Sequence, residues 1–141
     1  MVLEELGAYL QDEGLGTLGM DLFLGALPPD IPEVDTPGAV AALVPTPGFP
    51  AIYVHDLVDP AREQPVIQIL VRGEPYDYAA AQLWATEIWL ALGRIRNQAL
   101  SGTFYLGVTP LQSIMKLRDD DFERPMMTAQ FRIDKAVSAL P

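Results

Sequence analysis

Apolar side chains recur with helical spacing in two segments of the chain. The first is residues 2–13, where glutamates in the first turn favour a helix N-terminus and Gly14 suits the C-terminal cap. The second is the longer segment of about residues 76–99, which follows the turn Gly73-Glu74-Pro75. Its alanine-rich apolar face is predicted to pack on a sheet. This face comprises Ala80, Ala81, Trp84, Ala85, Ile88, Ala91, Leu92 and Ile95.

Shorter runs of apolar residues predict strands. In residues 66–72, Ile67, Ile69 and Val71 share one face. Residues 126–134 alternate apolar and polar side chains, which is typical of a half-buried antiparallel strand. The other predicted strands of this kind are Met20–Leu27, Phe104–Val108 and Leu111–Leu117. The order of elements predicts an α+β fold, with the long helix and the N-terminal helix packed on an antiparallel sheet.

Residues 28–65 form a proline-rich segment that holds nine of the 13 prolines. Proline has no backbone N–H for a strand ladder, so we expect only short edge strands here, at Ala39–Val44 and Ala51–His55. Apolar runs between the prolines favour a loop-rich part of one domain over a linker. We therefore expect a single domain over residues 1–141.

The composition is that of a globular protein, with 50% hydrophobic and 20% charged residues. The chain has no cysteine, which excludes disulfides, thiolate zinc sites and cysteine nucleophiles. Its first ten residues hold two glutamates and no basic residue, unlike a secretory signal. No apolar run is long enough to cross a bilayer, so we expect a soluble protein with no membrane partner.

The net charge of −10 is concentrated in the N-terminal part of the chain. Residues 1–61 hold ten acidic residues and no lysine or arginine, whereas residues 62–141 hold nine of each sign. Proteins that grip DNA need clustered basic residues, so this distribution disfavours tight binding to a DNA backbone. An equally simple interpretation is that the excess carboxylates keep the protein soluble.

The sequence offers few groups for catalysis or metal binding. His55 is the single histidine and has only its neighbour Asp56 as a potential partner. Asp119-Asp120-Asp121 lacks the spacing of a calcium loop and fits a solvated turn better. Glycine-rich phosphate loops and the G-x-S-x-G motif are absent. We therefore predict no catalytic, cofactor-binding or metal-binding residues.

Several segments together resemble the minor capsid or tail-terminator family of long-tailed bacteriophages. The clearest is QPVIQILVRGEPYDYAAAQLWATEIWLAL, residues 64–92, a strand, an RG turn and a helix. The N-terminal stretch from LGAYLQDE to GLGTLGMDLFLGALP and the C-terminal DDDFERPMMTAQFRI also resemble the family. The proline-rich segment departs from the pattern.

The resemblance implies a structural virion protein without enzymatic activity or cofactor. Members form a ring, commonly of six subunits, that caps the tail tube and joins it to the head. The implied partners are further copies of the chain, the major tail tube protein and a head-tail connector protein, while DNA passes through without specific binding. The implied location is the virion tail or neck, with assembly in the host cytoplasm. Two alternatives remain: another neck or head-completion connector, and a small ligand-binding or enzymatic α+β domain.

Two sets of residues are candidates for the assembly. Leu83 and Leu90 lie off the apolar face of the long helix, with Glu87 and Arg94 beside them, which predicts a subunit interface with an apolar centre and a charged rim. Alternatively, the proline-rich segment covers these leucines. For the second set, a central channel that carries DNA favours acidic walls. We therefore predict that Asp30, Glu33 and Asp35 line it.

Overall fold

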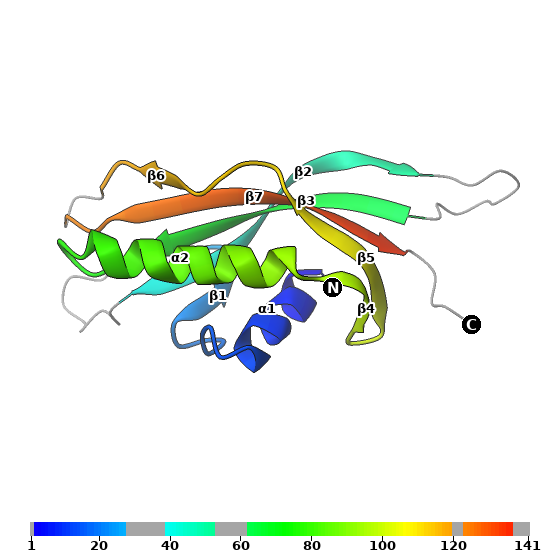
Figure 1. Ribbon diagram of the computed structural model, residues 1–141, viewed down its shortest axis with the longest axis horizontal. Coiled ribbons are helices and arrows are strands. Elements are labelled where there is room, and N and C mark those ends of the chain that lie inside the picture. The colour runs from blue at the N-terminus through cyan, green and yellow to red at the C-terminus, as the bar shows by residue number, and fades with distance from the viewer. Residues whose placement is uncertain (1, 28–38, 53–61, 120–122, 137–141) are drawn as a thin grey trace, which may run out of the picture.

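A seven-stranded sheet carries both helices on one of its faces (Figure 1). The computed structural model describes residues 2–27, 39–52, 62–119 and 123–136. The helices are α1 (Val2–Asp12) and α2 (Tyr78–Gly93). The strands are β1 (Leu22–Leu24), β2 (Val40–Ile52), β3 (Arg62–Arg72), β4 (Arg96–Leu100), β5 (Thr103–Pro110), β6 (Met115–Leu117) and β7 (Met126–Ala136).

The strands are arranged in the order β1-β2-β3-β7-β5-β4, and β6 pairs with the first part of β7 beside β5. The α+β class is confirmed, but the sheet is mixed rather than antiparallel. β1 runs parallel to β2, and the other pairs are antiparallel. The central pair, β3 and β7, aligns Ile69 with Ala129 and Val71 with Met127.

The core lies between the sheet and the two helices. Ile67, Ile69 and Val71 of β3 are buried, as are Phe131 and Ile133 of β7, so the faces predicted from their alternation are confirmed. The helices add Leu6, Leu10, Ala81, Ala85, Ile88, Ala91 and Leu92 to the same cluster. Each large aliphatic or aromatic side chain buried in this way stabilises the fold by about 1.5–3 kcal/mol.

The predicted helix over residues 76–99 is too long. α2 ends at Gly93, and Arg96–Leu100 forms β4, which pairs with β5 from Arg96↔Gly107 to Leu100↔Thr103. Ser101 and Gly102 make the two-residue turn between these strands, with φ of 51° and 89°. Two consecutive positive φ values are typical of the hairpin turn whose twist matches its strands. The Ser-Gly pair is the sequence signal for this hairpin.

The proline-rich segment contains more regular structure than the sequence predicted. Its two predicted short strands correspond to one 13-residue strand, β2. Its first residues lie between β1 and β3, whereas its second half pairs with β3 alone among the described strands. Leu43 marks the end of the pairing with β1, and the prolines follow from Pro45 onward. No described strand pairs with this edge of β2 beyond Leu43, so a missing N–H there breaks no described ladder.

Two smaller differences concern strand ends. The predicted strands Met20–Leu27 and Leu111–Leu117 shorten to β1 and β6. Residues 53–55 of the predicted strand Ala51–His55, His55 included, lie outside the described residues. No helix in the described part of the chain is long and apolar enough to cross a membrane.

Candidate assembly surface

α2 is an alanine-rich helix that lies close to the sheet and exposes its opposite side. Its N-cap residue is Asp77, whose side chain accepts a hydrogen bond from Ala80 N at 3.2 Å. At the other end, Arg94 N donates to Ala91 O at 3.2 Å. The sheet-facing side uses three alanines, which allows a close approach and fixes which residues remain outward.

The outward side of α2 carries the four residues predicted as a subunit interface. Leu83 is 61% exposed and Leu90 is 44% exposed, and Glu87 and Arg94 are exposed as well. Their spacing of four, three and four residues aligns them in one row, which we call the leucine ridge. The structure therefore brings these residues together on one accessible surface, and their role at an interface remains a prediction.

A groove runs along one side of the leucine ridge, between α2 and the segment that joins α1 to β1. We call it the acidic groove because of the carboxylates that line it. It consists of a cavity of about 380 Å³ and a second of about 140 Å³, and both are lined by Leu15 and Glu87. Its acidic side chains are Glu13, Asp21 and Glu87. The remaining lining residues are Gln11, Gly14, Gly16, Thr17, Trp84, Leu90, Ala91 and Arg94.

Hydrogen bonds fix the wall of this groove against α2. Trp84 Nε1 donates to Leu15 O at 2.7 Å, and Tyr9 Oη donates to Ala91 O at 3.0 Å. Burial raises the pKa of Tyr9, and the nearby Glu13 carboxylate raises it further. The tyrosine therefore stays protonated near neutral pH and keeps donating its hydrogen bond.

A buried polar pair anchors α1 on the sheet behind this surface. Tyr105 of β5 is fully buried and its Oη donates to Glu5 Oε1 at 3.0 Å. Burial raises the pKa of Tyr105 well above its ordinary value of 10.0, and the hydrogen bond to Glu5 adds to the shift. Because the phenol is enclosed and protonated, the pair is suited to holding α1 in place.

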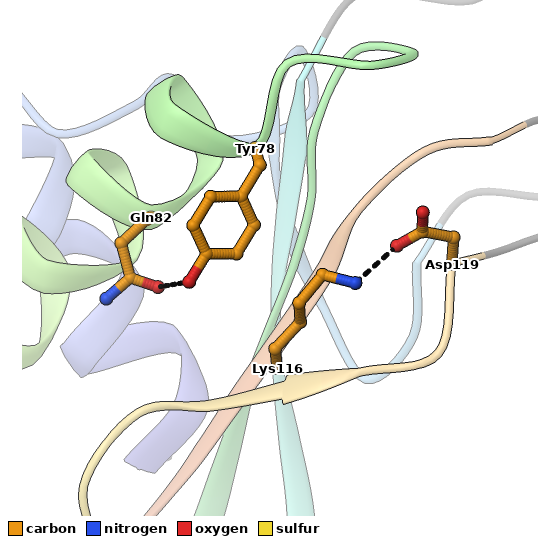
Figure 2. Close-up of polar contacts among 4 residues, drawn as sticks. All are labelled: Tyr78, Gln82, Lys116 and Asp119. Atoms are coloured by element: carbon orange, nitrogen blue, oxygen red, sulfur yellow. Dashed lines mark hydrogen bonds and ion pairs between the residues drawn. The ribbon is translucent and has the colours of Figure 1, made fainter.

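The side of α2 that lies away from the acidic groove faces β6 (Figure 2). This surface was not predicted from the sequence. Tyr78 is 47% exposed, its Oη donates to Gln82 Oε1 at 3.4 Å, and the Lys116 ammonium lies 6.0 Å from its ring centroid. About three turns further along the same face of α2, Trp89 Nε1 donates to Gln112 O at 3.3 Å. We call the surface formed by Tyr78, Trp89 and Lys116, together with Arg118, the exposed residue that directly follows β6, the β6 flank.

The other predicted site residues contribute little to this surface. Asp119 forms an ion pair with Lys116 at 2.8 Å, and Asp120 and Asp121 lie outside the described residues. The predicted channel residues Asp30, Glu33 and Asp35 also lie outside them. Within the described ranges, no group of three or more histidine, cysteine or carboxylate side chains is placed to hold a metal ion.

Comparison with known proteins identified a matching family and a similar fold among solved structures. The family described as bacteriophage tail terminator protein matches residues 9–137, which is most of the chain. No curated protein matches the sequence. Among solved structures, a chain of the virion of a native gene transfer agent particle has a similar fold, with a TM-score of 0.52. The two chains are 20% identical, and the match covers 93% of this chain and 84% of the other.

Proposed function

Because this chain belongs to the bacteriophage tail terminator family, we propose that it forms a ring that caps the tail tube and joins the tail to the head. Its role is therefore structural and its location the virion. We propose a ring of about six copies, the commonest arrangement implied by the resemblance. In this proposal the partners are neighbouring copies, the major tail tube protein and a head-tail connector protein, and the chain carries no catalytic activity.

The leucine ridge is the observation that supports self-assembly most directly. Leu83 and Leu90 are 61% and 44% exposed at the centre of the outward side of α2. Large exposed aliphatic side chains flanked by charges are the pattern of an interface with an apolar core and a polar rim. Contact with a second copy would remove both leucines from water.

The test replaces both leucines by aspartate. We expect Leu83→Asp with Leu90→Asp to leave circular dichroism and thermal unfolding close to wild type, because neither side chain belongs to the buried cluster. The same variant should fail to form rings in analytical ultracentrifugation, with and without tail tubes present. Met20→Asp is the control, because Met20 is also an exposed apolar residue, 69% exposed, but lies on neither the ridge nor the groove beside it.

Two outcomes would contradict the proposal. If the wild-type chain stays monomeric both alone and with tail tubes, the ring does not exist. If the double variant unfolds instead of dissociating, the leucines stabilise the monomer and the interface lies elsewhere.

A further inference from the structure

The two sides of α2 carry different and complementary chemistry. On one side, the leucine ridge adjoins the acidic groove, where three carboxylates outnumber the single cation, Arg94. On the other side, the β6 flank combines two aromatic rings with two cations, of which Lys116 is already ion-paired with Asp119. Arg118 is exposed and forms no ion pair with any residue that the structure describes. An apolar surface with acidic neighbours thus lies on the same helix as an aromatic surface with basic neighbours.

The two surfaces face different directions. At 100° per residue, Leu83 and Leu90 lie about 120–140° around the helix from Tyr78. In Figure 1, β6 lies above α2, and the segment between α1 and β1, which forms the groove, lies below it. The hydrogen bonds agree, since Trp84 bonds to Leu15 in the segment between α1 and β1, and Trp89 bonds to Gln112 in the segment between β5 and β6.

We propose that the leucine ridge and acidic groove of one copy pack against the β6 flank of the next copy. The inference rests on the proposed ring and names the surfaces that close it. Leu83 and Leu90 would contact the rings of Tyr78 and Trp89, while Glu87 would pair with Arg118. Aromatic residues and arginine are enriched at the centres of such interfaces, and complementary charges fix which surfaces meet.

This pairing is head-to-tail, because each copy uses two different surfaces. Repeating the same rotation from copy to copy closes a ring if the angles add to a full turn. A two-fold contact, in which the ridge of one copy meets the ridge of another, would instead bring Glu87 near its own symmetry mate and leave the β6 flank exposed. The two arrangements therefore predict different partners for Glu87.

Charge reversal at both surfaces tests the pairing. We expect Glu87→Arg alone and Arg118→Glu alone each to weaken ring formation by about tenfold or more, because each places like charges together. Combined in one chain, the two substitutions should restore the ring. An equimolar mixture of the two single variants should also form rings, in which the two kinds of copy alternate. Glu4→Arg, which reverses an exposed charge on α1 away from both surfaces, is the control.

Crosslinking gives an independent measurement, since the chain has no natural cysteine. Glu87→Cys with Arg118→Cys should give a ladder of disulfide-linked copies under oxidation, while either single variant should give none beyond background. The measurement is made on the free chain if the wild-type chain forms rings alone, and otherwise with tail tubes present.

The outcomes separate this inference from the proposed function. Wild-type rings together with normal rings from Arg118→Glu would overturn the pairing and leave the ring itself standing. Dimer-only crosslinking through Glu87→Cys alone would establish the two-fold contact instead. A wild-type chain that forms no ring, even on tail tubes, would remove both proposals.

Discussion

At the scale of single residues, Tyr105 and Glu5 show how a buried polar pair fixes one element on another. They are 100 residues apart in the chain and meet at 3.0 Å in the core. Removing one partner of a buried hydrogen bond costs about 1–3 kcal/mol. We therefore expect Tyr105→Phe to lower the free energy of unfolding by about that amount in urea denaturation. Tyr78→Phe, at an exposed position, should change it by less than about 0.5 kcal/mol.

The same tyrosine predicts a dependence of stability on alkaline pH. The pKa of Tyr105 is raised in the folded chain above the ordinary 10.0 of the unfolded chain. Below pH 10 both states hold the proton, so the contribution of Tyr105 to stability is fully present. Above pH 10 the unfolded state releases the proton first, so stability falls as pH rises. Tyr105→Phe should remove this part of the decline, and parallel pH profiles for the two proteins would contradict the assignment.

His55 and Asp119–Asp121 are the residues that the sequence analysis weighed for catalysis or metal binding. We expect His55→Ala, and separately Asn at all three aspartates, to change stability by less than about 1 kcal/mol and to leave particle assembly intact. The reason is that the sequence supplies no set of ligands or orienting groups around them. A metal-dependent activity in the purified protein, lost in either variant, would show that this interpretation is wrong.

At the scale of elements, β2 shows how prolines protect an open strand edge. Leu43 O accepts a hydrogen bond from Gly25 N at 2.7 Å, so its polar groups face β1. Two residues on, Pro45 faces the same way, where β1 no longer covers the edge, and offers no N–H. Edge prolines of this kind discourage pairing between sheets of different molecules.

Removing this protection should promote aggregation. We expect Pro45→Thr to restore an edge N–H and to increase light scattering in concentrated solution, while stability changes by no more than about 1 kcal/mol. Pro75→Thr, in the turn before α2, is the matched control. Equal solubility of the two variants would show that the β2 edge is protected by other means.

The parts of the fold that could be predicted are those that depend on local sequence patterns. The buried faces of β3, β7 and α2 follow from local periodicity. The prediction for α2 differs at its ends, because Ala80 is exposed and Ile95 is buried beyond the end of the helix. β4 was missed because Arg96–Leu100 has no apolar alternation and its pairing depends on β5. The leucine ridge was predicted because Leu83 and Leu90 lie outside the apolar face of the helix, which local periodicity defines. The β6 flank was not found, since Tyr78 and Lys116 meet only when β6 pairs with β7.

At the scale of the whole molecule, the uneven charge is the feature with the clearest consequence for a ring. All of the net charge of −10 comes from residues 1–61. About six copies would carry roughly −60, screened over about 8 Å at physiological salt. We propose that Asp30, Glu33 and Asp35 place part of this charge on the channel wall. An acidic wall would repel the DNA backbone and keep it moving.

Reversing these charges tests the channel proposal. Lysine at all three positions should slow DNA ejection from assembled particles, because basic side chains would hold the phosphates. Lysine at Glu4, Asp12 and Glu74, three exposed carboxylates outside both proposed contact surfaces, makes the same change in charge and serves as the control. Normal ejection from the first variant, with its lysines on the outer wall in a ring structure, would contradict the proposal.

The placement of the two tryptophans gives the protein an intrinsic fluorescent reporter of its own assembly. Trp84 borders the groove on one side of α2, and Trp89, half-buried, belongs to the β6 flank on the other. The proposed contact between copies would cover both indoles at once and remove them from water. Their emission should then shift to shorter wavelength as the concentration rises through the assembly range. Ring formation could thus be followed in real time on the unlabelled chain, with Trp89→Phe assigning the signal to one surface.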